Sequence, residues 1–401
     1  MIRAVVEQHA EDAAFLFTSR NAALEARYTR LEDLERLDER IAANLDGLRF
    51  AKHAGQRIAR MALRGGDAGE VFAAAVLACE SEKSGAVTRL FDEAPADALA
   101  EGLCGAVAWL PFGRQRAALR ELRASSNTVA RRAALVAQVA HRRDPENALL
   151  AGVLDDDPRI VATALRAIGE LGRTDLVVIL AAAMHGDDPE ARFWAAWSAA
   201  LLGEAIGSHV LRAIAEHGRA RAEQAAEIAA MTLPPSEAVA FVEGLTRRAD
   251  RRRAAIRGAA ALGDPKLLPT LLEWLDQPAL ARPAADAITT ITGLAITAEL
   301  SVEPPSDDDD DDETIDPDDG LAWPDAPALR AACERSRASW PAGTRHVLGH
   351  RIERSSLVRA LRLGRQPERV RAAFELARAG EPLIDVEAPS ERQLRALAGR
   401  S

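Results

Sequence analysis

The sequence predicts an all-α fold, an α-solenoid of helical hairpins with a helical cap at each end. Hydrophobic residues make up 48% of the 401 residues but aromatic residues only 4%. Most of the apolar side chains are Ala and Leu, which lose little freedom in a helix. A segment that begins with Asp-Pro and ends with Gly recurs along the chain. Between its copies lie further stretches with helical periodicity.

The two clearest copies of the repeat are DDPRIVATALRAIGELG at 156–172 and DDPEARFWAAWSAALLG at 187–203. At a constant offset of 31 residues, the Pro and the final Gly of the first copy align with Pro189 and Gly203 of the second. In each copy the Asp can supply an N-cap oxygen, and Pro occupies the first helical position, where its missing N–H costs nothing. The Gly permits the left-handed residue that ends the helix.

Weaker copies extend the pattern in both directions, at 66–80, 126–145, 249–265 and 275–293. Second helical patterns lie between the copies, at 176–184, 209–217 and 265–275. A period of about 30 residues with two helices per unit is typical of an α-solenoid, because a lone hairpin cannot bury its apolar stripe and must stack on a neighbour. We place the array at residues 61–300.

The segments on either side of the array are predicted to cap it. Residues 1–60 include an amphipathic helix at 27–50, whose apolar stripe is formed by Leu31, Leu34, Leu37, Ile41, Leu45 and Leu48. We interpret this helix as a cap on the first repeat, with a partner-binding or dimerising helix as the alternative. Residues 321–401 return to helical patterning and are predicted to form the C-terminal cap, with an extended segment at 381–389 before a last helix at 390–398.

An acidic stretch at 301–320 separates the array from the C-terminal cap. Its eleven acids are Glu303, Asp307 to Asp312, Glu313, Asp316, Asp318 and Asp319. Because such a stretch repels itself and has little apolar surface to bury, we expect a disordered insertion. A calcium loop of the EF-hand type is not expected, since counting back from Gly320 places Ile315 at the first ligand position. Diffuse cation binding and an electrostatic lure for a basic partner are the alternatives.

Composition and charge exclude several classes of function. The net charge is −10, but acids and bases nearly balance outside the acidic stretch, so binding to nucleic acid or to an anionic membrane is not expected. The three cysteines are far apart and have no metal-ligand spacing, which suits a reducing compartment. No leader and no run of about 18 apolar residues is recognisable. We therefore expect a soluble cytoplasmic protein.

The chain carries no recognisable catalytic motif, and we expect a protein that is not an enzyme and holds no cofactor or metal. Phosphate-binding Gly-rich loops, H-E-x-x-H and G-x-S-x-G are missing from the sequence. His346 and His350 are four residues apart and could share a helix face as metal ligands do, but an ordinary polar face is the simpler interpretation. The paired acids Asp156/Asp157 and Asp187/Asp188 recur at the repeat period, which favours helix capping over acid–base catalysis.

The repeat motif, Asp-Pro followed by an Ala-rich helix that ends in Leu-Gly, resembles the second helix of HEAT repeats. This includes the HEAT-like repeats of bilin lyases, and the resemblance covers residues 65–300. A narrower resemblance rests on RYTRLEDLERLDERIAANLDGL (27–48), LAWPDAPALR (321–330) and the segment 345–377. It is to a bacterial family of uncharacterised HEAT-repeat proteins often encoded near type VI secretion genes. That resemblance implies an accessory or adaptor role and carries no catalytic residues.

The run RRADRRR at 247–253 places five arginines at the start of a predicted helix, where the positive end of the helix dipole makes cations unfavourable. A solvated helix end is the simplest interpretation. The alternative is contact with phosphate or with an acidic surface, for which the chain's own Asp stretch is one candidate. On the second interpretation Arg251 and Arg252 are partner-binding residues.

The aligned repeats also assign faces to the tryptophans at 194 and 197. At 100° per residue, Trp194, Trp197 and Leu201 align with Thr163, Arg166 and Glu170, opposite the arc that carries the core positions. Either the chain's own N- or C-terminal part covers these tryptophans, or they anchor a protein partner on the concave surface, with Arg166 and Glu170 as a polar rim. On the second interpretation, replacing both tryptophans with Ala abolishes partner binding and leaves the helix content intact.

These observations predict a non-catalytic protein–protein interaction scaffold or adaptor that uses the concave surface of the solenoid. The family resemblance suggests a role accessory to type VI secretion, with a secretion effector or spike component as the partner. The alternative is a HEAT-like enzyme of the bilin lyase or DNA base-excision type. A cleft lined by an acid and aromatics would favour the enzyme.

Overall fold

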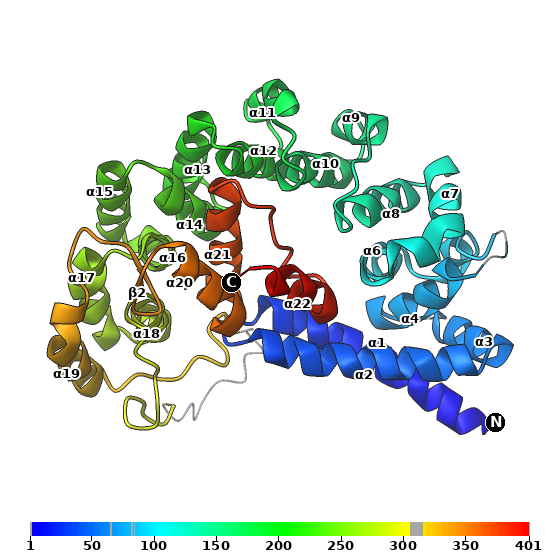
Figure 1. Cartoon of the computed structure of the whole chain (residues 1–401), viewed down its shortest axis with the longest axis horizontal. Helices are drawn as coiled ribbons and strands as arrows, with labels where there is room; N and C mark the ends of the chain where they lie inside the picture. Colours follow the sequence, from blue (N-terminus) through cyan, green and yellow to red (C-terminus); the bar gives the residue numbers. More distant parts are fainter. Residues whose placement is uncertain (1, 65, 82, 84, 305–315, 401) are drawn as a thin grey trace. The chain divides into compact units, whose positions relative to one another are not determined.

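The computed structural model describes residues 2–64, 66–81, 83, 85–304 and 316–400. Within them it contains 22 α-helices and one two-stranded hairpin, so the predicted all-α class is confirmed (Figure 1). Its contacts divide the chain into two compact units. Unit 1 comprises the residues up to Leu176 together with Ile384–Gly399, and unit 2 comprises Val177–Leu383 with the final residues. The domain boundaries predicted from the sequence, at residues 60, 300 and 320, remain a prediction. The division into two units falls at other positions, after Leu176 and after Leu383.

Unit 1 is built from the N-terminal helices and the last helix of the chain. Its helices are α1 (Arg3–Glu25), α2 (Leu31–Phe50), α3 (His53–Ala62), α4 (Ala68–Cys79), α5 (Leu90–Glu93), α6 (Ala96–Trp109), α7 (Arg116–Ala124), α8 (Thr128–Val139), α9 (Asn147–Val153), α10 (Pro158–Glu170) and α22 (Ser390–Ala398). Helix α1 packs on α2 and α4, and α4, α6, α8 and α10 then pack one on the next. The rings of Phe17 and Phe72 stack at 4.1 Å between centroids, which joins α1 to α4 in the core.

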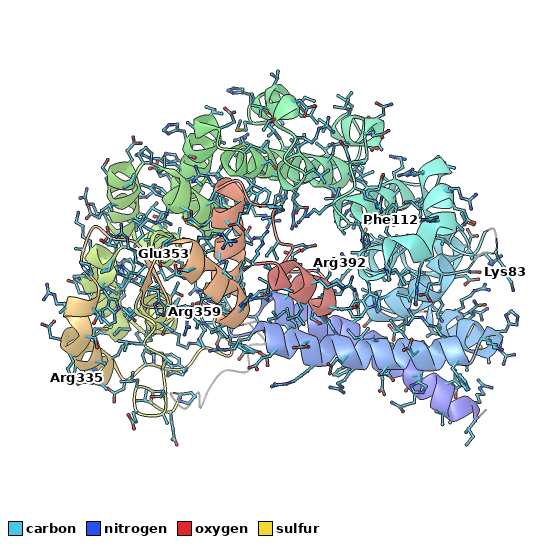
Figure 2. The ribbon with its side chains drawn as sticks, viewed as in Figure 1. Lys83, Phe112, Arg335, Glu353, Arg359 and Arg392 are labelled. Atoms are coloured by element: carbon cyan, nitrogen blue, oxygen red, sulfur yellow. The ribbon has the colours of Figure 1, made fainter. Side chains whose placement is uncertain are left out.

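The amphipathic helix predicted at 27–50 is observed as α2, which begins at Leu31, and its stripe is buried inside unit 1 except for the half-buried Leu37. The last helix, α22, contacts it. Asp38 of α2, which is buried, accepts hydrogen bonds from Arg20 Nε at 2.5 Å and from the Ser390 backbone N–H at 2.6 Å. Arg392 of α22, labelled in Figure 2, donates to the carbonyls of Ala108 and Ala140 near the ends of α6 and α8. The C-terminal segment thus satisfies carbonyls that a helix end leaves without partners.

Unit 2 has the same kind of packing within itself. Its helices are α11 (Val177–Ala183), α12 (Pro189–Leu201), α13 (Ala205–His217), α14 (Ala222–Thr232), α15 (Pro235–Thr246), α16 (Arg252–Leu262), α17 (Leu268–Glu273), α18 (Pro278–Thr292), α19 (Ala326–Ser336), α20 (Arg354–Leu363) and α21 (Gln366–Arg378). Helices α12, α14, α16 and α18 form a row in which each packs on the next, and α13, α15 and α17 pack beside them (Figure 1).

The helix starts predicted from the Asp-Pro pairs are confirmed. Asp157 accepts a hydrogen bond from the Arg159 backbone N–H at 2.8 Å, and Asp188 accepts one from the Ala191 N–H at 2.6 Å. The glycines that follow α10 and α12 have φ of +68° and +88°, as the predicted left-handed ends require.

The structure corrects the idea that His346 and His350 could share a helix face. They lie in a hairpin of β1 (His346–Val347) and β2 (His350–Arg351), in which Val347 pairs with His350. The two-residue turn at Leu348 and Gly349 has φ of +50° and +79°, the left-handed pair that a tight hairpin needs. The turn's N–H groups donate to the carbonyls of Thr290 and Ile291 at the end of α18.

The predicted acidic insertion lies for the most part outside the described residues, which resume at Asp316. Its two described ends are held in place. The backbone N–H of Val302 donates to the Trp323 carbonyl at 2.9 Å, and Ser301 forms an isolated bridge with Pro324. At the C-terminal end of the stretch, Asp318 is buried, with 4% of its surface exposed. These ends of the stretch therefore belong to the folded part of unit 2.

Candidate interaction sites

The tryptophans of α12 belong to an aromatic cluster that reaches into α21. Trp194 contacts Phe193 and Trp197 edge to face, and Trp197 contacts Phe374 of α21 at 5.6 Å between ring centroids. Both indoles are half-buried and Leu201 is buried. Trp197 therefore contacts the chain's own C-terminal part, and the two alternatives that the sequence left open for this face remain predictions.

Helix α21 is fixed against the row by buried ion pairs. Arg371 Nε donates to Glu227 of α14 at 2.6 Å, and both side chains are less than one tenth exposed. Farther along the row, Arg365 pairs with Asp286 of α18. Glu368, which follows on α21, accepts a hydrogen bond from Thr290 at 2.8 Å. The partners are up to 144 residues apart in sequence, so the repeat pattern could not reveal them.

The predicted polar rim, Arg166 and Glu170, belongs to unit 1, whereas the tryptophans belong to unit 2. Arg166 donates to Glu170 at 2.7 Å and lies 3.5 Å from a Glu387 carboxylate oxygen. Glu170 also accepts from Arg142 at 3.0 Å. Both rim residues are therefore engaged in ion pairs within their own unit.

The arginine run forms part of a pocket of about 780 Å³ in unit 2. The N-terminal ends of α14, α16 and α18 meet there. Six arginines line it, namely Arg219, Arg221, Arg251, Arg252, Arg253 and Arg257. The acids in the lining are Glu223 and Asp250. Both arginines singled out from the sequence, Arg251 and Arg252, therefore lie in one cationic pocket.

Neighbouring groups hold the pocket arginines in place. Arg251 donates to the Gly218 carbonyl at 2.7 Å, and Arg252 donates to Gln277 Oε1 at 3.0 Å. Arg221 forms a two-pronged pair with Glu190 of α12, at 2.9 and 3.0 Å. Because both prongs are fixed, the guanidinium plane has a defined direction.

The acidic stretch supplies the second such pair. Arg253 donates to both carboxylate oxygens of Asp318, at 2.9 and 2.7 Å. Hydrogen bonding to Asp318 raises the pKa of Arg253 above its ordinary value, and hydrogen bonding from Arg282 holds the pKa of Asp316 below its ordinary range. Contact between the arginine run and the chain's own Asp stretch was one of the options drawn from the sequence. The structure shows this contact for Arg253 of the run and Asp318 of the stretch.

Clusters of metal ligands and cysteine thiols are two kinds of reactive group that a protein can offer. No group of three or more His, Cys, Asp or Glu side chains there could hold a metal ion. Burial raises the pKa of the Cys79 thiol to about 12, and that of Cys104 and of Cys333 to about 11. These thiols remain protonated at neutral pH, whereas a nucleophilic cysteine reacts as the thiolate. No described helix has the length and apolar character that crossing a bilayer requires.

Comparison with known proteins finds similar solved structures but no family. No family model and no curated protein matches the chain. A crystal structure of an engineered protein from the Northeast Structural Genomics Consortium is similar to it at 15% sequence identity. That similarity covers 95% of this chain and 100% of the other, with a TM-score of 0.33.

Replacing the indole that contacts α21, Trp197→Ala, is expected to lower the free energy of unfolding by roughly 2 kcal/mol, because truncating a half-buried aromatic leaves a cavity. Chemical denaturation of the variant measures this change. If Trp197 and Phe374 pack directly, the double variant with Phe374→Ala costs less than the two single changes added together. Strictly additive effects would contradict that packing.

Proposed function

We propose that the protein is a non-catalytic protein-interaction scaffold, a solenoid of HEAT-like hairpins whose partner-binding surface is the arginine-lined pocket. The observation that carries this proposal is the cluster of six arginines at the meeting point of three helix starts, of which Arg219 and Arg252 form no ion pair with the other described residues. Surfaces that concentrate one sign of charge attract and orient oppositely charged partners.

The tryptophan face is a weaker candidate for the partner surface. Trp197 already contacts the chain's own α21, and buried ion pairs hold α21 in place. A partner on this face would have to displace α21 and break those pairs, which is costly once a buried charge loses its counterpart. The pocket requires no such displacement.

The resemblance to a family encoded near type VI secretion genes makes a cytoplasmic component of that system, such as an effector or a spike protein, the partner that we propose to test first. The lining of the pocket favours the scaffold over the enzyme alternative. Its distinguishing feature would be a cleft lined by an acid and aromatics, whereas the lining of the arginine pocket contains no aromatic side chain among the described residues.

A photocrosslinking residue in place of Arg219 tests the proposal, because this exposed arginine lines the pocket and forms no ion pair with the other described residues. In cells of the source organism, illumination is expected to yield one discrete adduct with a second protein. The adduct should disappear when the crosslinker is combined with Arg251→Gln and Arg252→Gln.

The control carries the same crosslinker in place of Arg335, an exposed arginine on α19 outside the pocket. We expect no discrete adduct from that position. Equal adducts from both positions, or an adduct that persists without Arg251 and Arg252, would argue against the pocket as the partner surface. Mass spectrometry of the adduct then decides whether a secretion component is the partner.

A further inference from the structure

The three helices that begin at the pocket lack the capping carboxylate that the row uses elsewhere. Helix α12 begins with Asp188, whose side chain accepts a hydrogen bond from the first turn. The corresponding N-cap residues of α14, α16 and α18 are Arg221, Arg251 and Gln277, and none of them makes a side-chain capping hydrogen bond within the described residues. Helix α16 continues directly from the 3-10 turn Ala249–Arg251, so it is the starts of α14 and α18 that present backbone N–H groups without a capping side chain.

Arginine is an unfavourable residue at these positions. The start of a helix carries a partial positive charge, so a carboxylate there is stabilising and a guanidinium is destabilising. The row nevertheless places Arg221, Arg251, Arg252 and Arg253 at or next to two successive helix starts. The Nε of Arg252 is shielded from solvent and donates to no acceptor in the described residues. An anion bound in the pocket would offset the positive charge of these arginines and cap the helix starts.

The chain itself indicates which kind of anion fits. Two arginines that line the pocket already bind carboxylates in planar, two-pronged geometry, Arg253 with Asp318 and Arg221 with Glu190. Asp318 and its neighbour Asp316 come from an acidic segment that docks beside the pocket, on Arg253 and Arg282. A guanidinium fork matches the two oxygens of a carboxylate in this way.

We infer that the pocket binds an acidic peptide segment of the partner, whose Asp and Glu carboxylates pair with the pocket arginines and supply the missing N-terminal caps of α14 and α18. This inference rests on the proposed function and names the chemistry of its partner. The pocket, at about 780 Å³ and lined by three helix starts, has room for several side chains rather than one small ion.

The first test measures binding of a short fluorescent Asp/Glu peptide to the full chain by anisotropy, with the matched Asn/Gln peptide as reference. We expect the acidic peptide alone to bind, and to bind about tenfold more weakly when ionic strength rises from low to physiological, as exposed charge pairs are screened. Arg251→Gln/Arg252→Gln should weaken binding tenfold or more by removing charge-assisted hydrogen bonds. Arg335→Gln/Arg337→Gln, at two exposed arginines outside the pocket, is the matched control and should change nothing.

The second test restores a cap. Gln277→Asp recreates the Asp-Pro start of α12 at the head of α18, because Pro278 follows. If ligand carboxylates serve as caps, this variant melts at a higher temperature than the wild type and binds the acidic peptide about fivefold more weakly, since the internal carboxylate occupies the ligand's position. Unchanged or tighter binding would overturn the inference.

Two further outcomes separate this inference from the proposed function. If the Arg219 crosslink forms while no acidic peptide binds, the pocket has a protein partner of other chemistry and the inference is wrong. If inorganic phosphate alone raises the melting temperature as much as the peptide does, the pocket is a general anion site and the inference is again wrong. If both the crosslink and the peptide fail, the proposed function falls together with the inference.

Discussion

Replacing the glutamate that anchors α21, Glu227→Gln, is expected to lower the free energy of unfolding by roughly 3–5 kcal/mol. Glu227 is 6% exposed on α14 and lies between two guanidiniums. Arg371 of α21 donates to it at 2.6 Å, and Arg257 of α16 lies 3.3 Å away. A neutral amide there leaves buried positive charge without its counter-charge, which is among the most destabilising single changes.

The measurement is the shift of the denaturation curve of the full chain, followed by circular dichroism. Glu223→Gln is the matched control, since Glu223 is also on α14 but pairs with Arg253 only at 3.5 Å and is 43% exposed in its side chain. An exposed pair of this kind contributes less than about 1 kcal/mol. Equal effects of the two variants would show that burial of the Glu227 pair is not what holds α21.

The parts of the fold that were predictable from the sequence are those that local chemistry determines. The Asp-Pro start and Gly end of each clear repeat depend on residues within one helix, and Asp157 and Asp188 cap as expected. The apolar stripe of α2 was predictable as well, because it depends only on the spacing of apolar residues within one segment. The all-α class follows from these elements, and the HEAT-like solenoid remains our proposal.

The parts that were not predictable depend on contacts between distant segments. Nothing in the repeat pattern indicates that Arg371 meets Glu227, or that α22 belongs to the N-terminal unit. Four-residue spacing made a helix conceivable at His346 and His350, but Leu348 and Gly349 between them adopt left-handed φ and turn the chain back on itself. A leucine with left-handed φ is uncommon, so a turn at this position was not predictable from its residues.

The candidate site was likewise predictable in part. The sequence identified the arginine run because cations at a helix start are unfavourable, and its members Arg251 and Arg252 line the pocket. It did not identify Arg219 and Arg221, which reach the same pocket from the preceding helix start. A second signal was nevertheless present in the sequence, namely the loss of the capping Asp at three successive helix starts, which becomes informative once the repeats are aligned.

Replacing the glycine that ends α16, Gly263→Ala, is expected to cost roughly 3 kcal/mol. Its φ of +72° is strained for any residue with a Cβ, a penalty of about 1 kcal/mol. In addition, an added Cβ would lie 2.2 Å from the His346 carbonyl oxygen, so the hairpin that packs on this helix end must move away. That movement breaks the hydrogen bond from the His346 N–H to the Gly263 carbonyl, at 2.7 Å, and the bond from Arg345 to the Leu262 carbonyl, at 2.8 Å.

Gly203→Ala separates these two contributions. Gly203 ends α12 with φ of +88°, but an added Cβ there would meet no atom within 4 Å among the described residues. This variant should therefore show the backbone penalty alone, about 1 kcal/mol in a denaturation experiment. The difference between the two variants measures how strongly the β1–β2 hairpin is held against the end of α16. Limited proteolysis should then cut the 340–353 segment faster in Gly263→Ala than in Gly203→Ala, and equal cleavage in both would show that the hairpin does not depend on this close approach.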